Sequence, residues 1–206
     1  MSITLHEGDL PAGLTFGASV AVDSETLGLN PHRDRLCLVQ LSAGDGNAHL
    51  VHIVQTASGL AEAPRLKALM ADAKVMKIFH FGRFDMAVLY HRLGVMPAPV
   101  YCTKIASKLA RTYTDRHGLK DLCKELIGVE LNKEQQSSDW GSGKLSPEQQ
   151  AYAASDVLYL HRLKAVLETM LAREDRTHLT QACFDFLPTR ARLDLAGWPE
   201  ADIFAH

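Results

Sequence analysis

The spacing of apolar residues changes along this 206-residue chain, and that change limits the class of fold. In the first half, short apolar or alternating runs are separated by turn residues, which is typical of strands. Four runs predict strands: Val20 to Asp23, Arg35 to Leu41, Ala48 to Val54 and Val75 to Phe79. The first three follow one another closely, so they predict an antiparallel meander.

Helical periodicity appears between these strands and dominates beyond Pro99, where strand signals nearly vanish. Five segments predict helices: Pro64 to Ala71, Phe84 to Leu93, Thr103 to Ala110, Leu119 to Ile127, and Pro147 to about Leu171. Ser146 can cap the last helix, and Gln149 can complete a capping box with it. The whole pattern predicts an α/β fold in which helices flank a mixed sheet.

The end of the chain predicts a tail. One more helix is expected after Arg173, followed by Pro188 and by Gly197-Trp198-Pro199. We expect residues 1–173 to form one domain and residues 174–206 to pack on that domain or, as we favour, on a neighbouring subunit. This segment has too much apolar surface to remain a free extension in solvent. Its large apolar side chains are Phe184, Phe186, Leu193, Leu195, Trp198 and Phe204. The polar segment Asn132 to Lys144, which is rich in serine and glycine, predicts a loop.

The charge balance limits the partners. With 22 basic and 24 acidic residues, the net charge of −2 provides no broad positive field for a long phosphate backbone. The four cysteines lack a C-x-x-C pair and predict buried free thiols. The first eight residues lack the features of a signal peptide, and no apolar run is long enough to span a bilayer. We therefore expect a cytoplasmic location and no membrane contact.

Acidic side chains stand where the predicted strands end. Asp23 and Glu25 share one face of a strand, because side chains two residues apart point the same way. Such a pair repels itself unless a cation neutralises it, although a solvated turn is the simpler reading. Asp85 follows a strand through Gly82 at a helix start, where a plain first-turn aspartate is equally expected.

Tyr152 and Asp156 lie four residues apart on the predicted long helix, so their side chains share one face. Small residues between them leave that face accessible. An amphipathic helix that buries a tyrosine and exposes an aspartate would have the same pattern.

Taken in order, Asp-x-Glu, an Asp in His-x4-Asp and Tyr-x3-Asp resemble the DEDDy 3′–5′ exonucleases of the ribonuclease D type. The resemblance runs from about Val20 to Leu167 and is close over Glu134 to Leu160. Ribonuclease D proper has Arg-Pro-Leu where this chain has Gly143-Lys144-Leu145, and it continues into C-terminal RNA-binding domains. The short length, the loop from Thr26 to His32 and the Gly-Trp-Pro tail look instead like nanoRNase C, a group of stand-alone diribonucleases.

This resemblance implies a ribonuclease H-like (DnaQ-like) fold with a five- to six-stranded sheet, and a ring-shaped homo-oligomer. It also implies catalysis with two divalent cations, Mg²⁺ or Mn²⁺, which prefer the oxygen ligands present here. Asp23, Glu25 and Asp156 would hold one cation, Asp23 would bridge to the second, and Asp85 would support the second through water. Tyr152 would orient the attacking water, since a phenol is mostly protonated at neutral pH.

Five further residues are candidates for substrate binding. Leu29 matches the place where related enzymes wedge an apolar side chain against terminal bases, although a core leucine fits equally well. Arg83 and Lys144 could take phosphate charge or be solvated surface. His80 could contact the sugar or pack. Trp140 could stack on a base or pin its loop, and we favour the pin.

Three functions are compatible with these residues. The first is hydrolysis of very short RNA, down to dinucleotides, to 5′-mononucleotides, which the near-neutral charge favours. The second is trimming of longer RNA or DNA ends. The third is an inactive nuclease-like domain that binds RNA or a protein partner, but the presence of all five motif residues argues against it.

Overall fold

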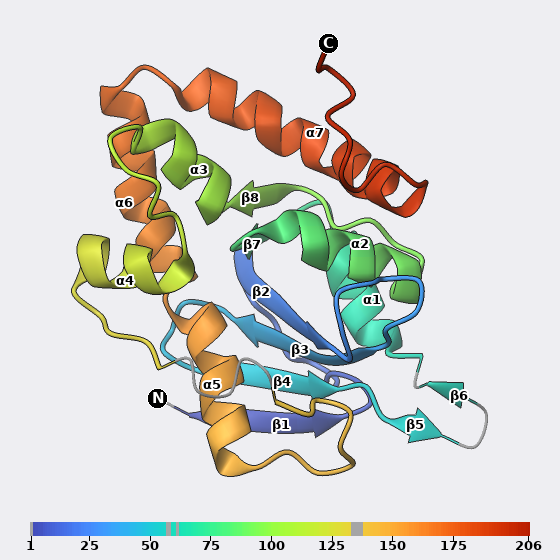
Figure 1. Ribbon diagram of the computed structural model, residues 1–206. Coiled ribbons are helices and arrows are strands. Elements are labelled where there is room, and N and C mark those ends of the chain that lie inside the picture. The colour runs from blue at the N-terminus through green and yellow to red at the C-terminus, as the bar shows by residue number, and fades with distance from the viewer. Residues whose placement is uncertain (1, 57–58, 61, 133–137) are drawn as a thin grey trace.

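The computed structural model describes residues 2–56, 59–60, 62–132 and 138–206. Its centre is a six-stranded mixed sheet with the strand order β1-β4-β3-β2-β7-β8 (Figure 1). The strands are β1 (Ile3–Glu7), β2 (Ser19–Thr26), β3 (Leu36–Ser42), β4 (Ala48–His52), β7 (Met76–Phe79) and β8 (Val100–Cys102). A separate pair consists of β5 (Gln55–Thr56) and β6 (Gly59–Leu60).

The predicted meander is confirmed, because β3 pairs antiparallel with both β2 and β4. The other sheet neighbours are parallel: β2 with β7, β7 with β8, and β1 with β4. Strand β2 continues to Thr26, so Glu25 lies on the strand and not after it. The two edge strands were not predicted, and one of them, β8, lies beyond Pro99, where strand signals nearly vanish.

Seven helices surround the sheet in the described residues. They are α1 (Pro64–Ala71), α2 (Gly82–Leu93), α3 (Thr103–Ala110), α4 (Leu119–Ile127), α5 (Pro147–Leu158), α6 (Leu160–Arg173) and α7 (Thr177–Leu195). The predicted bounds of α1, α3 and α4 are confirmed. None of these helices has both the length and the apolar character that a membrane crossing requires.

The single long helix predicted from Pro147 is wrong, because the chain breaks at Tyr159, where φ is −109° and ψ is −4°. The two halves pack on different partners. Helix α5 lies on β1, β2, β3 and β4, whereas α6 packs against α3 and α4. One straight helix could not follow both surfaces. The start of α5 is as predicted, since Ser146 and Gln149 form a capping box.

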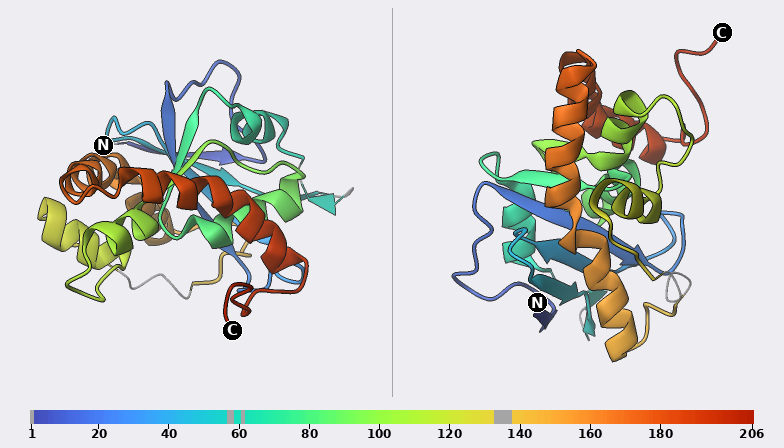
Figure 2. Two further views of the ribbon diagram at one scale, coloured as in Figure 1. Left: turned by 90° about the horizontal axis from the view of Figure 1, so that it is seen from above. Right: turned by 90° about the vertical axis from the view of Figure 1, so that its left-hand side faces the viewer.

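Helix α7 runs along α2 and the β8 edge of the sheet (Figures 1 and 2). It buries Phe184 and Leu187, so the helical part of the tail packs on its own domain. Pro188 lies inside this helix, and the prediction that it follows the helix is wrong. Phe186, Trp198 and Phe204 remain exposed, and their contact with a neighbouring subunit stays a prediction.

The main core lies between the sheet and its helices, and a second cluster seats α5 on the sheet. That second cluster joins Leu38 and Leu50 of the sheet to Trp140, Leu145 and Ala153. The loop before α5 is irregular over residues 138–144, as predicted, while residues 133–137 of the predicted loop lie outside the described residues. Three cysteines are buried as expected, but Cys183 on α7 is exposed.

Candidate active site

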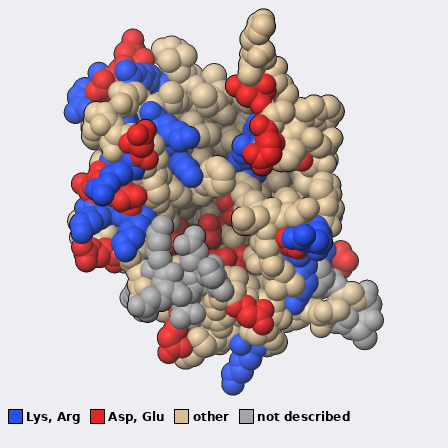
Figure 3. Space-filling view, in the orientation of Figure 1, with Lys and Arg blue, Asp and Glu red and all other residues tan. Residues whose placement is uncertain are grey.

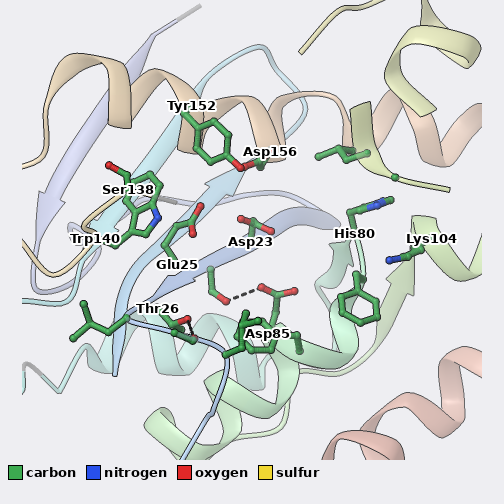
Figure 4. A pocket seen from close by; sticks show the side chains of 18 residues that line it. Asp23, Glu25, Thr26, His80, Asp85, Lys104, Ser138, Trp140, Tyr152 and Asp156 are labelled. Atoms are coloured by element: carbon green, nitrogen blue, oxygen red, sulfur yellow. Dashed lines mark hydrogen bonds between the residues drawn. The ribbon is translucent and has the colours of Figure 1, made fainter. Parts of the chain in front are cut away.

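Two acidic side chains project from β2 at the centre of the sheet. Strand alternation puts Asp23 and Glu25 on one face, and α5 brings Asp156 over the same face (Figure 4). One carboxylate oxygen from each of these three residues lies within 4.8 Å of the others. The structure therefore brings together three acids that the sequence pattern grouped.

The fourth acid, Asp85, comes from the first turn of α2 and is buried. It accepts a hydrogen bond of 2.6 Å from the Oγ of Ser24, and both residues line a cavity that Asp23 and Glu25 also line. The sharp entry to α2 places it there. Phe81 has a φ of 66°, in the left-handed region, and a Cβ on Gly82 would lie 2.6 Å from the Cβ of Phe79.

Burial and mutual repulsion make this cluster costly to ionise. Burial, followed by the neighbouring carboxylates, raises the pKa of Asp23 well above its ordinary value and that of Glu25 to about 9. Burial raises the pKa of Asp85 to about 7, although the hydrogen bond from Ser24 opposes that shift. Within the described ranges, no Lys or Arg forms an ion pair with Asp23, Glu25 or Asp85.

This donor set fits divalent cations that prefer oxygen ligands. In the described part of the chain the carboxylates of Asp23, Glu25 and Asp85 have no Lys or Arg ion pair, and carboxylate oxygens are the preferred ligands of Mg²⁺ and Mn²⁺. The space-filling view shows acidic side chains inside a hollow in the middle of one face, while Lys and Arg gather along its left side (Figure 3). A cation held by Asp23, Glu25 and Asp156 would lie in this hollow.

Tyr152 lies one helical turn before Asp156 and is half-buried at the same cavity. Burial, reinforced by the charges of Asp156 and Glu25, raises the pKa of its phenol. The side chain is therefore a neutral hydrogen-bonding group at physiological pH. Trp140 packs against it with ring centroids 6.0 Å apart and is buried, which is compatible with a role in pinning its loop; that role stays a prediction.

The acids and the tyrosine line a cavity of about 690 Å³. Leu29 also lines it and is 85% exposed, which rules out the alternative of a core leucine. His80 lines the same cavity, and its Nδ1 is 2.9 Å from the Oγ1 of Thr103. Of the predicted substrate-binding residues, Leu29, His80 and Trp140 are thus at the cavity.

The two predicted phosphate-binding cations do not line this cavity. The guanidinium of Arg83 donates to both carboxylate oxygens of Asp194, at 2.5 and 2.8 Å, and is thereby committed to α7. Lys144 is exposed on the loop before α5. Contact of either residue with substrate phosphate stays a prediction.

Sequence reasoning missed a cation and two aromatic side chains at this cavity: Lys104, Phe81 and Phe84. The Nζ of Lys104 lies 4.1 Å from the centre of the Phe81 ring. Lys104 follows β8, the strand that was not predicted, so its position beside α2 could not be read from the sequence. Phe81 had a local signal, because it stands next to Gly82 at the strand-to-helix junction.

Comparison with known proteins agrees with this geometry. Residues 10–172 match the model of a 3′–5′ exonuclease family. The structure is similar to Brucella melitensis NrnC bound to pGG, with 60% identity and a TM-score of 0.95 over 100% of this chain and 99% of that one. It is also similar to Brucella melitensis NrnC with bound Mg²⁺, with 58% identity and a TM-score of 0.93 over 100% of both chains.

A ribonuclease D from Jannaschia sp. (strain CCS1) is 34% identical over 160 residues, which are 77% of this chain and 41% of the relative. The chain thus spans about two fifths of the length of the ribonuclease D relatives that it matches. These similarities confirm the predicted ribonuclease H-like (DnaQ-like) fold and the resemblance to the ribonuclease D type.

Proposed function

The chain belongs to the 3′–5′ exonuclease family, and we propose that it is an exoribonuclease acting on very short RNA, down to dinucleotides, to release 5′-mononucleotides. The observation that carries the proposal is the cluster of four carboxylates and Tyr152 in one cavity of about 690 Å³. Their types and positions suit phosphodiester hydrolysis at a chain end.

Each residue at the cavity has a role in this reaction. Asp23, Glu25 and Asp156 would hold one cation, and Asp23 with Asp85 would hold a second. Two such cations supply an activated water and stabilise the leaving oxyanion. Tyr152, kept protonated by burial, positions the attacking water through a hydrogen bond and does not abstract its proton.

Several observations support a short substrate. A cavity of about 690 Å³ is the size of a small-ligand site. The net charge of −2 provides no broad positive field for a long phosphate backbone, which would take roughly 6–10 phosphate contacts. The exposed Leu29 gives an apolar surface that suits any terminal base. A relative that matches the whole chain binds the dinucleotide pGG.

The test compares the hydrolysis of a labelled RNA dinucleotide with that of a labelled RNA 7-mer, at equal concentration in Mg²⁺ and in Mn²⁺. We expect kcat/KM for the dinucleotide to exceed that for the 7-mer by at least about tenfold. Equal or faster cleavage of the 7-mer contradicts the short-substrate proposal. An Asp156→Asn variant, checked for folding by circular dichroism, controls for contaminating nucleases and should cleave neither.

A second candidate is the trimming of longer RNA or DNA ends, which the 34% identity to a ribonuclease D favours. Faster cleavage of the 7-mer supports it, and a DNA 7-mer in the same assay measures the sugar preference. An inactive domain that only binds RNA or a protein is the third candidate, and dinucleotide turnover excludes it.

The proposal also covers the cations, the oligomeric state and the cellular compartment of the enzyme. Mg²⁺ and Mn²⁺ are both expected to support turnover, because both prefer oxygen ligands. The exposed Phe186, Trp198 and Phe204 support a ring-shaped homo-oligomer, which the mass of the particle in solution tests. Four free cysteines support a reducing compartment such as the cytoplasm.

A further inference from the structure

Three apolar side chains, Leu29, Phe81 and Phe84, separate the active-site cavity from a second cavity, and we call them the apolar ridge. All three line both cavities, and the second one has a volume of about 660 Å³. The far side of the second cavity is formed by Asp194 and by residues that follow α7, among them Pro199. The ridge therefore has substrate space in front of it and the end of the chain behind it.

The loop that carries Leu29 is braced within itself. The backbone N–H of Leu27 donates to the carbonyl of Arg35 at 3.1 Å, and that of Asp34 donates to the carbonyl of Asn30 at 2.7 Å. These bonds shape the loop, and a loop that is held less firmly from outside would open them more often. Leu29 is 85% exposed, so its own side chain provides little anchorage.

His32 ties the loop to the end of α7. The Nε2 of His32 lies 2.9 Å from the carbonyl oxygen of Leu195, the last residue of α7. Because a carbonyl only accepts, Nε2 must carry the proton and donate it. The His32 ring also meets the edge of His91 on α2, with centroids 5.1 Å apart. The loop thus rests on the end of α7 and on α2 together.

The end of α7 is itself fixed to α2. Asp194 accepts two hydrogen bonds from Arg83 of α2. It also forms an ion pair with Arg190 of α7, at 2.8 Å. These side chains are largely shielded from solvent, which makes such a bidentate pair more specific than an exposed one. Since α2 also carries Asp85 and Phe84, the same support holds the ridge and one of the acids.

We propose that the end of α7 is a positioning element for the substrate, which holds Leu29 over the bound terminal base through His32. The inference rests on the proposed function and adds positioning residues to it, since neither His32 nor Asp194 touches the reacting atoms. The whole-chain similarity to the pGG-bound protein includes this segment, whereas the exonuclease family match ends at residue 172.

The test compares His32→Leu, which cannot donate to Leu195, with His32→Gln, whose amide can. For the RNA dinucleotide, we expect His32→Leu to raise KM about 3- to 10-fold, the effect of one lost hydrogen bond, with kcat within about twofold of the parent. His32→Gln should recover most of the loss. The control is His178→Leu, which removes an exposed histidine from α7. It should change neither KM nor kcat.

A double variant tests whether His32 acts through Leu29. If it does, adding His32→Leu to Leu29→Ala should change KM by less than about twofold further, because the positioned side chain is already gone. Full multiplication of the two effects, or an equal fall in kcat, overturns the inference.

Hydrogen exchange separates this inference from the proposed function. The amides of Leu27 and Asp34 should exchange faster in His32→Leu than in the parent, and unchanged exchange overturns the positioning role. If the parent protein fails to hydrolyse the dinucleotide, the proposed function is wrong. In that case, faster exchange at the two amides still shows that α7 holds the loop through His32. Unchanged exchange still refutes that contact as a support of the loop.

Discussion

We expect the hydroxyl of Ser24 to govern how readily Asp85 releases its proton to water and binds a cation in its place. Its Oγ donates to the carboxylate of Asp85 at 2.6 Å, and both side chains are buried. A hydrogen bond to a charged group contributes about 1.5–3 kcal/mol, so Ser24→Ala should raise the proton affinity of Asp85 by about 10- to 100-fold. Burial already raises the pKa of Asp85 to about 7, which makes the loss visible at physiological pH.

Protons and Mg²⁺ compete for the same carboxylate, which gives the direction of the pH effect. At pH 7 the Mg²⁺ concentration for half-maximal activity should rise about 5- to 50-fold in Ser24→Ala relative to the parent. At pH 9 the added protonation is mostly gone, and the ratio should fall to within about twofold. Initial rates of dinucleotide hydrolysis over a Mg²⁺ titration at pH 7, 8 and 9 measure this ratio.

The control removes a similar hydroxyl from the same sheet. Ser42 is buried on β3 and donates to the backbone carbonyl of Asn47 at 2.7 Å, away from the acids. Ser42→Ala should leave the Mg²⁺ dependence unchanged at every pH. An unchanged half-saturating concentration in Ser24→Ala, or a rise of equal size at pH 7 and pH 9, would refute the role given to the Ser24 hydroxyl.

Three further predictions concern the same cavity. Asp23→Asn or Asp156→Asn should abolish dinucleotide hydrolysis, and retained activity contradicts the cation assignment. Either substitution should also raise the melting temperature in EDTA, because removing one carboxylate relieves the repulsion among the remaining ones. The pKa values of Glu25 and Asp85 in the fold, about 9 and about 7, exceed their ordinary values, so the folded chain binds more protons than the unfolded one. Without metal, the free energy of unfolding from urea titrations should therefore fall as pH rises from about 4 to about 9, less steeply in Glu25→Gln; an equal slope in both argues against this origin. Tyr152→Phe should lower kcat about 100-fold or more with little change in half-saturating Mg²⁺, and near-parental kcat excludes a role for the hydroxyl in positioning water.

The helices with strong local signals were predictable, and the edges of the sheet were not. Pro64 at the start of α1 and the Ser146–Gln149 capping box mark helix starts by short-range chemistry. By contrast, β8 has three residues and forms a strand only because β7 lies beside it. The break at Tyr159 results from the different surfaces on which α5 and α6 pack. No glycine or proline lies near Tyr159 in the sequence, so the break could not be predicted from local residues.

The acids of the site were predictable because each lies in a short motif, whereas the cations depend on contacts between distant segments. Asp23, Glu25 and Asp156 sit at spacings that place them on one face of a strand or helix. In the sequence, Arg83 and Lys144 are equally good candidates for binding phosphate. In the structure, Asp194 binds Arg83 although the two residues are 111 positions apart. Charge and composition cannot reveal such a pair.

The order of the strands has a consequence for the chain while it is being made. Strands β2, β3 and β4 are consecutive in sequence and adjacent in the sheet, so Asp23 and Glu25 can reach their places early. Asp156 leaves the ribosome only with α5, and at roughly 5–20 residues per second that takes on the order of ten seconds more. A nascent chain therefore carries an incomplete set of ligands for most of its synthesis, and it becomes able to cut RNA only when the last third of the chain is in place.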